Sequence, residues 1–202
     1  MNFGLIIIGD EILSGKRQDK HLAKVIELLS ARGLALAWST YVGDDPRRIT
    51  DTLRTAFASG DVVFSCGGIG ATPDDHTRQC AAAALGVPLA LHPEAYELIM
   101  ERVRQMAIEK GWSDDPNHPD TIHRTNMGVF PVGAQIIPNP YNKIPGFSVG
   151  DVHFVPGFPV MAHPMIEALL DTRYAHLHGA GAQEERSVIV YGSMEASLTP
   201  LM

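Results

Sequence analysis

Three apolar runs, at residues 3–8, 34–42 and 61–65, alternate with helix-like stretches in the first third of the chain. The first and third runs are continuous, which is typical of parallel strands covered on both faces. The intervening residues 19–32 and 46–57 repeat apolar side chains at helical spacing. This alternation predicts an α/β fold with a doubly wound, mostly parallel sheet.

The rest of the chain continues the pattern with less regularity. Residues 94–110 and 159–170 have helical spacing, and short β-like runs occur at 134–137 and 152–155. The segments around these two runs are rich in proline and glycine, which is typical of ordinary connections and also of rigid pocket walls.

A chain of 202 residues is long enough for one full core and the beginning of a second unit. We assign residues 1–174 to the main domain and residues 175–184, which are rich in small side chains, to a linker. Residues 185–202 read as the beginning of a small second α/β unit, so the chain is interpreted as a possible fragment.

Charge and composition exclude several kinds of partner. The net charge is −7 and no cluster of lysine and arginine is present, so we expect no nucleic-acid partner. The apolar N-terminal run is too short to span a bilayer and lacks a basic lead, so we expect a cytoplasmic protein without a membrane partner. Cys66 and Cys80 match neither a disulfide framework nor a zinc pattern.

The segment 66–75 is a glycine-rich loop directly after the third predicted strand. Gly67, Gly68 and Gly70 allow a ligand to approach the backbone closely, because glycine tolerates positive φ and has no side chain. The loop lacks the Gly-Lys-Ser/Thr of a Walker loop and the third glycine of a dinucleotide fingerprint. Spacing alone therefore favours a phosphate site and a plain tight turn equally.

The end of this loop predicts a helix start at Pro73. Thr72 is the expected N-cap, Pro73 fits the first turn, and Asp75 occupies the capping-box position. Asp74 and Asp75 then have two interpretations. Acids in a first turn complement the helix dipole, and one of them could instead hold Mg²⁺ against phosphate oxygens.

Other polar residues follow the predicted strands. Asp10, Glu11 and Ser14 come after the first strand, and Asp44 follows the second. Because parallel strands end at one edge of a sheet, these residues are placed for a metal ion or a hydroxyl-bearing ligand. Solvated turn acids would give the same pattern.

Four segments together resemble one family. They occur in its order, at residues 9–15, 42–45, 67–77 and 156–159. The chain resembles the MoaB/Mog molybdopterin-binding domain, in the form that opens competence/damage-inducible protein A, over about residues 3–172.

The resemblance implies a three-layer α/β/α domain that often assembles as a trimer, with its pocket at the glycine-rich loop. It implies that acids matching Asp44 and Asp75 take part in the chemistry, and we add Asp10 as a third candidate catalytic and metal-binding residue. The candidate ligand-binding residues are Gly67, Gly68, Gly70, Thr72, Asp74, Ser14, Pro156 and Gly157.

Two functions follow from the resemblance. The first is hydrolysis of an ADP-ribose-like pyrophosphate with a divalent metal, with Mg²⁺ as the suspected ion. The second is a non-hydrolytic module that binds molybdopterin, which is suggested by departures from the branch at His21, Ala71 and Val160. A purely structural trimer is a third, weaker hypothesis.

Overall fold

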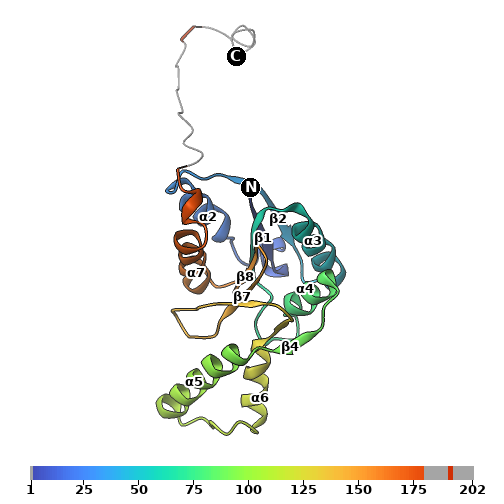
Figure 1. Cartoon of the computed structure of the whole chain (residues 1–202), viewed down its shortest axis with the longest axis vertical. Helices are drawn as coiled ribbons and strands as arrows, with labels where there is room; N and C mark the ends of the chain where they lie inside the picture. The colour runs from blue at the N-terminus through green and yellow to red at the C-terminus, as the bar shows by residue number, and fades with distance from the viewer. Residues whose placement is uncertain (1, 180–190, 193–202) are drawn as a thin grey trace.

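The computed structural model describes residues 2–179 and 191–192. Its main feature is a six-stranded sheet with the order β2-β1-β3-β8-β7-β6 (Figure 1). The first four strands are parallel, and β7 and β6 complete the sheet in antiparallel pairing. The bounds of these strands, in sheet order, are Leu36–Val42, Phe3–Ile8, Val62–Cys66, Val152–Val155, Gly146–Val149 and Gln135–Ile137.

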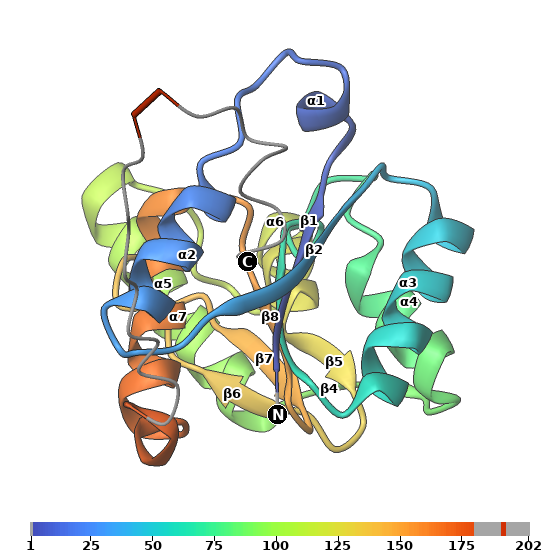
Figure 2. The same ribbon diagram turned by 90° about the horizontal axis from the view of Figure 1, so that it is seen from above.

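Helices cover both faces of this sheet, as seen from above in Figure 2. Helices α2 (His21–Ser30) and α7 (Pro159–Thr172) pack on one face. Helices α3 (Pro46–Ser59) and α4 (Thr77–Leu85) pack on the other. The predicted α/β fold with a mostly parallel sheet between two helical layers is therefore confirmed.

Strand β1 shows why its apolar run is continuous. All six of its residues are buried. Leu5 and Ile7 pack under α2 and α7, whereas Ile6 and Ile8 pack under α3 and α4. A central strand has two buried faces, so both alternating sets of side chains must be apolar.

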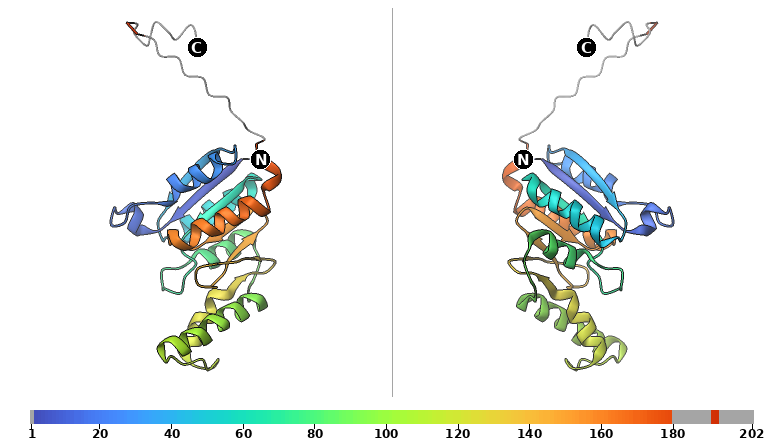
Figure 3. Two further views of the ribbon diagram at one scale, coloured as in Figure 1. Left: turned by 90° about the vertical axis from the view of Figure 1, so that its left-hand side faces the viewer. Right: turned by 90° about the vertical axis from the view of Figure 1, so that its right-hand side faces the viewer.

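A smaller lobe projects away from the sheet (Figures 1 and 3). It contains α5 (Pro93–Lys110), α6 (Pro119–Thr125) and an antiparallel pair, β4 (Leu89–Leu91) with β5 (Val129–Pro131). Of these elements, the sequence predicted only α5. No helix among the described residues is both long and apolar enough to cross a membrane.

Most of the C-terminal segment for which the sequence made predictions lies outside the described residues. In the segment 175–184 a short 3₁₀ turn, η2 (Ala175–Leu177), is present, and the Gly179 amide donates to the carbonyl of Arg32 at 2.9 Å. The second unit predicted at residues 185–202 lies outside the described residues, except for residues 191–192. The division into domains therefore stays a prediction.

A buried polar chain joins the end of the fold to the sheet. His153 Nδ1 lies 2.7 Å from Ser148 Oγ, and His153 Nε2 lies 2.6 Å from the Tyr174 hydroxyl. That hydroxyl donates to Asp151 at 2.8 Å, so it must accept from the Nε2–H of His153. Burial, together with the charge of Arg173, lowers the pKa of His153 to about 3.

We expect the buried hydrogen bonds of His153 to make the stability of the fold sensitive to acid. His153 titrates near pH 6.5 in the unfolded chain and near 3 in the fold, so its contribution is present above about 6.5 and is lost between these values. In His153→Gln, the pH dependence of the unfolding free energy in this window should fall by up to about 1.4 kcal/mol per pH unit.

Urea unfolding at a series of pH values measures this slope. The matched control is His176→Gln at an exposed histidine, which should keep the wild-type slope. Equal slopes for His153→Gln and wild type would contradict the assignment of a neutral, buried His153.

Candidate functional site

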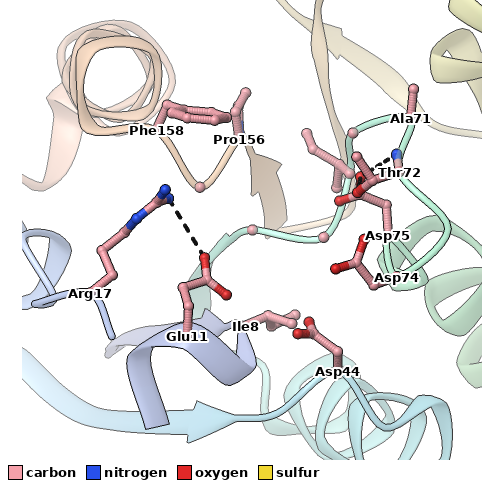
Figure 4. Close-up of a pocket in the computed structure, with 16 residues that line it drawn as sticks. Ile8, Glu11, Arg17, Asp44, Ala71, Thr72, Asp74, Asp75, Pro156 and Phe158 are labelled. Atoms are coloured by element: carbon pink, nitrogen blue, oxygen red, sulfur yellow. Dashed lines mark hydrogen bonds and ion pairs between the residues drawn. The ribbon is translucent and has the colours of Figure 1, made fainter. Parts of the chain in front are cut away.

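The candidate site lies at the carboxyl ends of the four parallel strands. A cavity of about 310 Å³ opens there, which we call the main cavity (Figure 4). The strand order places β2 on one side of β1 and β3 on the other, so the chain turns in opposite directions at β1. Ligands of open α/β sheets bind at such switch points. The main cavity is lined by residues 8, 9, 11, 17, 44, 67–72, 74, 75 and 156–158.

Two glycines of the loop are required by packing alone. Gly67 and Gly68 have φ angles of 110° and 68°, in the region that favours glycine. A Cβ at Gly67 would collide with the carbonyl oxygen of Ile8, and one at Gly68 would collide with Thr77 Oγ1. These glycines therefore support the tight-turn interpretation whether or not a ligand binds.

The amides of the loop divide into used and unused groups. Gly67 N–H donates to the carbonyl of Val155 at 3.0 Å, so it is not free for a ligand. The amides of residues 68–71 have no hydrogen-bond partner within residues 2–179 and 191–192, and all four residues line the main cavity. An amide without a protein acceptor can donate to an anion, so an anion is a suitable partner for these four amides.

The predicted helix start at Pro73 is wrong, because α4 begins at Thr77. Asp75 Oδ2 accepts from the backbone amide of Thr72 at 2.8 Å and from its hydroxyl at 2.6 Å. These bonds close a turn that is not helical. Thr72 is therefore no N-cap, and Asp74 and Asp75 do not lie in a first helical turn, so the dipole interpretation of these acids is also wrong.

Arg78 lies beneath the loop and was not identified from the sequence. Its side chain is almost fully buried and donates to the carbonyls of Gly70 at 2.7 Å and Asn126 at 3.0 Å. Burial lowers the pKa of the guanidinium, and the charge of Asp75 opposes that effect. A cation under the loop favours an anion above it and fixes the loop in place.

We expect Arg78→Met to lower the free energy of unfolding by about 2–3 kcal/mol, because two partly buried hydrogen bonds from a charged donor are lost. Chemical denaturation gives this quantity. The matched control is Arg54→Met, where an exposed arginine pairs with Asp51 on α3 and the change should stay below about 0.5 kcal/mol. Equal losses in both variants would contradict the role given to Arg78.

Asp10 and Asp44, which we call the acid pair, are held together by two reciprocal hydrogen bonds. Asp10 N–H donates to Asp44 Oδ2 at 2.9 Å, and Asp44 N–H donates to Asp10 Oδ1 at 3.1 Å. A Cβ at Gly43 would collide with Asp10 Oδ1. Burial raises the pKa of Asp44, and the charges of Asp10, Glu11 and Asp74 raise it further.

The structure thus brings some of the predicted acids together and separates others. Asp74 faces Asp44 across the main cavity, whereas Asp75 turns toward Thr72 (Figure 4). Asp10 and Ser14 border a neighbouring depression that shares Asp44 and Asp74 with the main cavity. Within the described part of the chain, no group of three or more histidine, cysteine, aspartate or glutamate side chains has metal-binding geometry.

A second basic residue missed from the sequence is Arg17. It lines the main cavity, pairs with Glu11 at 3.6 Å, and lies over the ring of Phe158 at 5.8 Å (Figure 4). The only sequence signal was its position two residues after the segment 9–15. Pro156 and Gly157, which were predicted to bind the ligand, form the wall beside it.

We expect Asp44→Asn to stabilise the protein when no divalent cation is present, because it removes a carboxylate whose ionisation the fold opposes. Asparagine keeps the acceptor for Asp10 N–H. The expected rise in Tm is about 1–2 °C, small because water screens this half-buried site.

Thermal unfolding with and without Mg²⁺ measures the effect. We expect Mg²⁺ to raise the Tm of the wild type more than that of Asp44→Asn. A lower Tm for the variant without cation would show that Asp44 is a structural acceptor only.

The fold and the cavity define an α/β domain with an open cavity at the carboxyl ends of its parallel strands. The chain belongs to the family described as "Probable molybdopterin binding domain", whose model matches residues 4–176. This confirms the family resemblance that the four segments indicated.

Relatives support the same assignment. The chain is 35% identical over 164 residues to a CinA-like protein of Anaeromyxobacter sp. (strain K). This match covers 79% of the chain and 38% of that relative. A CinA-like protein of Syntrophotalea carbinolica is 30% identical over 203 residues, and this match covers 96% of the chain and 46% of that relative. The chain therefore spans less than half the length of these relatives.

Solved structures agree with the fold. The crystal structure of the protein CinA from Thermoplasma acidophilum, described as having unknown function, has a TM-score of 0.70 and 27% identity. The match covers 85% of this chain and 98% of the CinA chain. The molybdopterin biosynthesis enzyme MoaB of Thermus thermophilus has a TM-score of 0.50 and 20% identity, covers 87% of this chain and 94% of its own, and supports the fold alone.

Proposed function

We propose that the main cavity binds a phosphate-bearing nucleotide or pterin, and that the domain hydrolyses an ADP-ribose-like pyrophosphate with a divalent cation. One observation carries this proposal. An acid pair with a raised Asp44 pKa lies at the same sheet edge as the guanidinium of Arg17 and four amides that have no partner in the described part of the chain. Donors for phosphate oxygens and ligands for a cation are thus combined in one site.

The anion side of the site relies on local groups. The protein has a net charge of −7, so long-range attraction cannot draw a phosphate in. The amides of residues 68–71 can donate to phosphate oxygens, as in other backbone anion sites. Arg17 adds an exposed charge, and Arg78 adds a buried charge beneath Gly70. The same amides would stabilise charge that develops on a phosphate during hydrolysis.

The cation side fits Mg²⁺. Asp10 and Asp44 each use one carboxylate oxygen in the reciprocal hydrogen bonds, and the second oxygen of each has no partner in the described chain. Mg²⁺ is usually held by one or two carboxylates, substrate phosphates and water, so a two-acid site suits it. When bound, such an ion polarises a phosphate and makes water a better nucleophile. Asp75 remains a proposed third acid.

The second candidate function is a module that binds molybdopterin without hydrolysing it. The family description favours a pterin. In addition, His21 donates from Nε2 to the carbonyl of Gly157 at 3.1 Å, and burial lowers the pKa of its ring. A neutral histidine in this position supports the cavity wall and brings no charge to the chemistry.

A homotrimer in the cytoplasm is part of the proposal on the basis of the resemblance.

The test is ADP-ribose hydrolysis by the whole chain with Mg²⁺. We expect Asp44→Asn to lower kcat/KM by at least about 100-fold, the scale of losing one well-placed electrostatic group. The matched control is Asp51→Asn on the exposed face of α3, which should keep the wild-type rate. Binding of ADP-ribose without turnover would favour the second function. If the protein neither binds nor hydrolyses ADP-ribose, and binds no pterin, both proposed functions are contradicted.

Asp75 needs its own pair of variants, because it also closes the loop. Asp75→Asn keeps an acceptor for the two donors of Thr72 but removes the charge, whereas Asp75→Ala removes both. If Asp75 is a catalytic or metal-binding acid, both variants should lose at least about 100-fold in kcat/KM. Retained activity in Asp75→Asn alone would assign Asp75 to loop geometry.

A further inference from the structure

Two histidine rings contact each other next to the main cavity, where α2 and α7 lie side by side (Figure 1). His21 is the first residue of α2 and is almost fully buried, whereas His163 lies in the second turn of α7 and is partly buried. The ring centroids are 5.3 Å apart, and the ring planes are almost perpendicular, at 87°. We call these two rings the histidine pair.

The histidine pair is connected to the main cavity through Gly157. His21 Nε2 donates to the carbonyl of Gly157 at 3.1 Å, since a carbonyl can only accept. Gly157 lines the main cavity, and a Cβ at this position would stand 3.3 Å from the Cα of Gly67 in the glycine-rich loop. The hydrogen bond from His21 therefore holds the wall at residues 156–158 against that loop.

Both rings of the pair have a nitrogen atom without a partner. His21 Nδ1 and His163 Nε2 are shielded from solvent and have no hydrogen-bond partner among the described residues. Because Nε2 of His21 carries the proton, Nδ1 of the neutral ring is a bare acceptor. A proton added there would create a buried charge and a donor without an acceptor, and both are unfavourable. The observed arrangement thus requires a neutral His21 ring.

Asp19 is the acidic group that acts on both rings. Its charge favours the protonated form of each ring. Its oxygens already accept from the amides of His21 and Leu22, at 2.7 and 3.1 Å, and from the hydroxyl of Tyr41, at 2.9 Å. In this arrangement Asp19 accepts from neither of the two unpartnered nitrogen atoms. It therefore attracts a proton to the pair without offering that proton a hydrogen bond.

The other groups around the pair oppose protonation. Burial lowers the pKa of both rings. At His163, the ring of His21 and the charge of Lys24 lower the pKa further. A hydrogen bond with the backbone of Lys20 raises it, but not enough to cancel the other effects. Both rings are therefore neutral near neutral pH, and the pair takes up its first proton below pH 6.5, the ordinary pKa of histidine.

The start of α7 joins His163 to the wall over a short and weakly tied segment. Residues 156–158 run directly into the helix, which begins at Pro159. Pro164 lies inside the helix and has no N–H, so the carbonyl of Val160 receives no helical hydrogen bond from it. A displacement of the His163 ring can therefore move the first turn of α7 and the wall that precedes it.

We propose that His163 is a positioning residue for the main cavity: it holds the ring of His21 in place to bind Gly157, and uptake of one proton by the histidine pair breaks this contact and moves the wall at residues 156–158. His163 is the more exposed ring and moves toward solvent, and His21 then leaves Gly157. The displaced wall no longer packs on the glycine-rich loop, so an anion in the main cavity is held less tightly. The effect on a ligand rests on the proposed function, whereas the movement of the wall does not.

This arrangement gives the wall a pH dependence of defined sign. Rings whose pKa is lowered favour the observed arrangement at high pH, so the wall is complete above pH 6.5 and is lost as the pH falls below that value. Other groups at the site, Asp44 among them, also titrate in acid. Only the difference between wild type and variants therefore reports on the histidine pair.

The first measurement is NMR of the ligand-free whole chain from about pH 7.5 to about pH 4.5, a range that spans the ordinary histidine pKa. We expect the amide resonances of Gly157 and Phe158 in wild type to shift with the same midpoint as the ring signals of the pair. The double variant His21→Asn with His163→Phe keeps a donor for Gly157 and a flat ring but takes up no proton. This shift should be absent in it.

The matched control is His123→Phe at an exposed histidine of α6, which should keep the wild-type transition. Thermal unfolding at the upper pH checks that each variant folds. If the double variant does not fold, His163→Phe alone carries the test and should reduce the shift. Wall resonances that ignore the ring titration in wild type, or that shift equally in the variants without the pair, overturn the proposal.

The second measurement is calorimetry with Mg²⁺ and inorganic pyrophosphate over the same pH range. Uptake of one proton changes affinity by up to about tenfold per pH unit, so wild type should lose at least about threefold more affinity than the double variant across the range. At the upper pH, His163→Ala should weaken binding by about threefold or more, because it removes the supporting ring, and His163→Phe should stay within about twofold of wild type.

The outcomes separate this proposal from the proposed function. If pyrophosphate binds with the same pH dependence in wild type and in the double variant, the cavity is a phosphate site that the histidine pair does not control, and this proposal alone is overturned. If pyrophosphate does not bind at any pH, the proposed function is contradicted, and the NMR transition of the ligand-free protein still decides whether the pair moves the wall.

Discussion

The site depends on how closely three backbone segments approach one another at one sheet edge. The Cα of Gly67 lies 3.3 Å from where a Cβ would stand at Gly157, and a Cβ at Gly67 itself would strike the carbonyl of Ile8. A side chain at residue 67 would therefore keep the ends of β1 and β3 apart, and a side chain at residue 157 would push against the end of β3. This contact sets the path of the loop that follows, and hence the place of the four unpaired amides.

Charged side chains of both signs lie around this edge of the sheet. Asp44 and Asp74 line the main cavity and Asp10 borders the depression beside it, while Arg17 pairs with Glu11 and Arg78 lies beneath Gly70. Mutual repulsion of the acids costs stability, and a bound divalent cation with phosphate would offset it. Functional sites often keep such unfavourable local charge, because it is relieved only when the ligand binds. The site is thus best explained as complementary to a cation and an anion together.

The sequence predicted the sheet well because β1 and β3 are buried on both faces, and such strands read as continuous apolar runs. It failed at the start of α4, where Thr72 and Asp75 have capping-box spacing but close a turn before the helix. It also missed Arg78, whose role depends on contacts with Asn126, 48 residues away. Contacts of that kind leave no local pattern. The second unit predicted at residues 185–202 lies outside the described chain, except for residues 191–192, and stays a prediction.

The central claim is that the unpaired amides of residues 68–71 and the acid pair together hold a phosphate and a divalent cation. The most direct measurement is an amide NMR titration of ¹⁵N-labelled protein with inorganic pyrophosphate and Mg²⁺. The account predicts that the largest shifts occur at residues 68–71 and at Asp10 and Asp44, and that they require both components. Unchanged resonances at residues 68–71, with shifts confined to other parts of the chain, would contradict it.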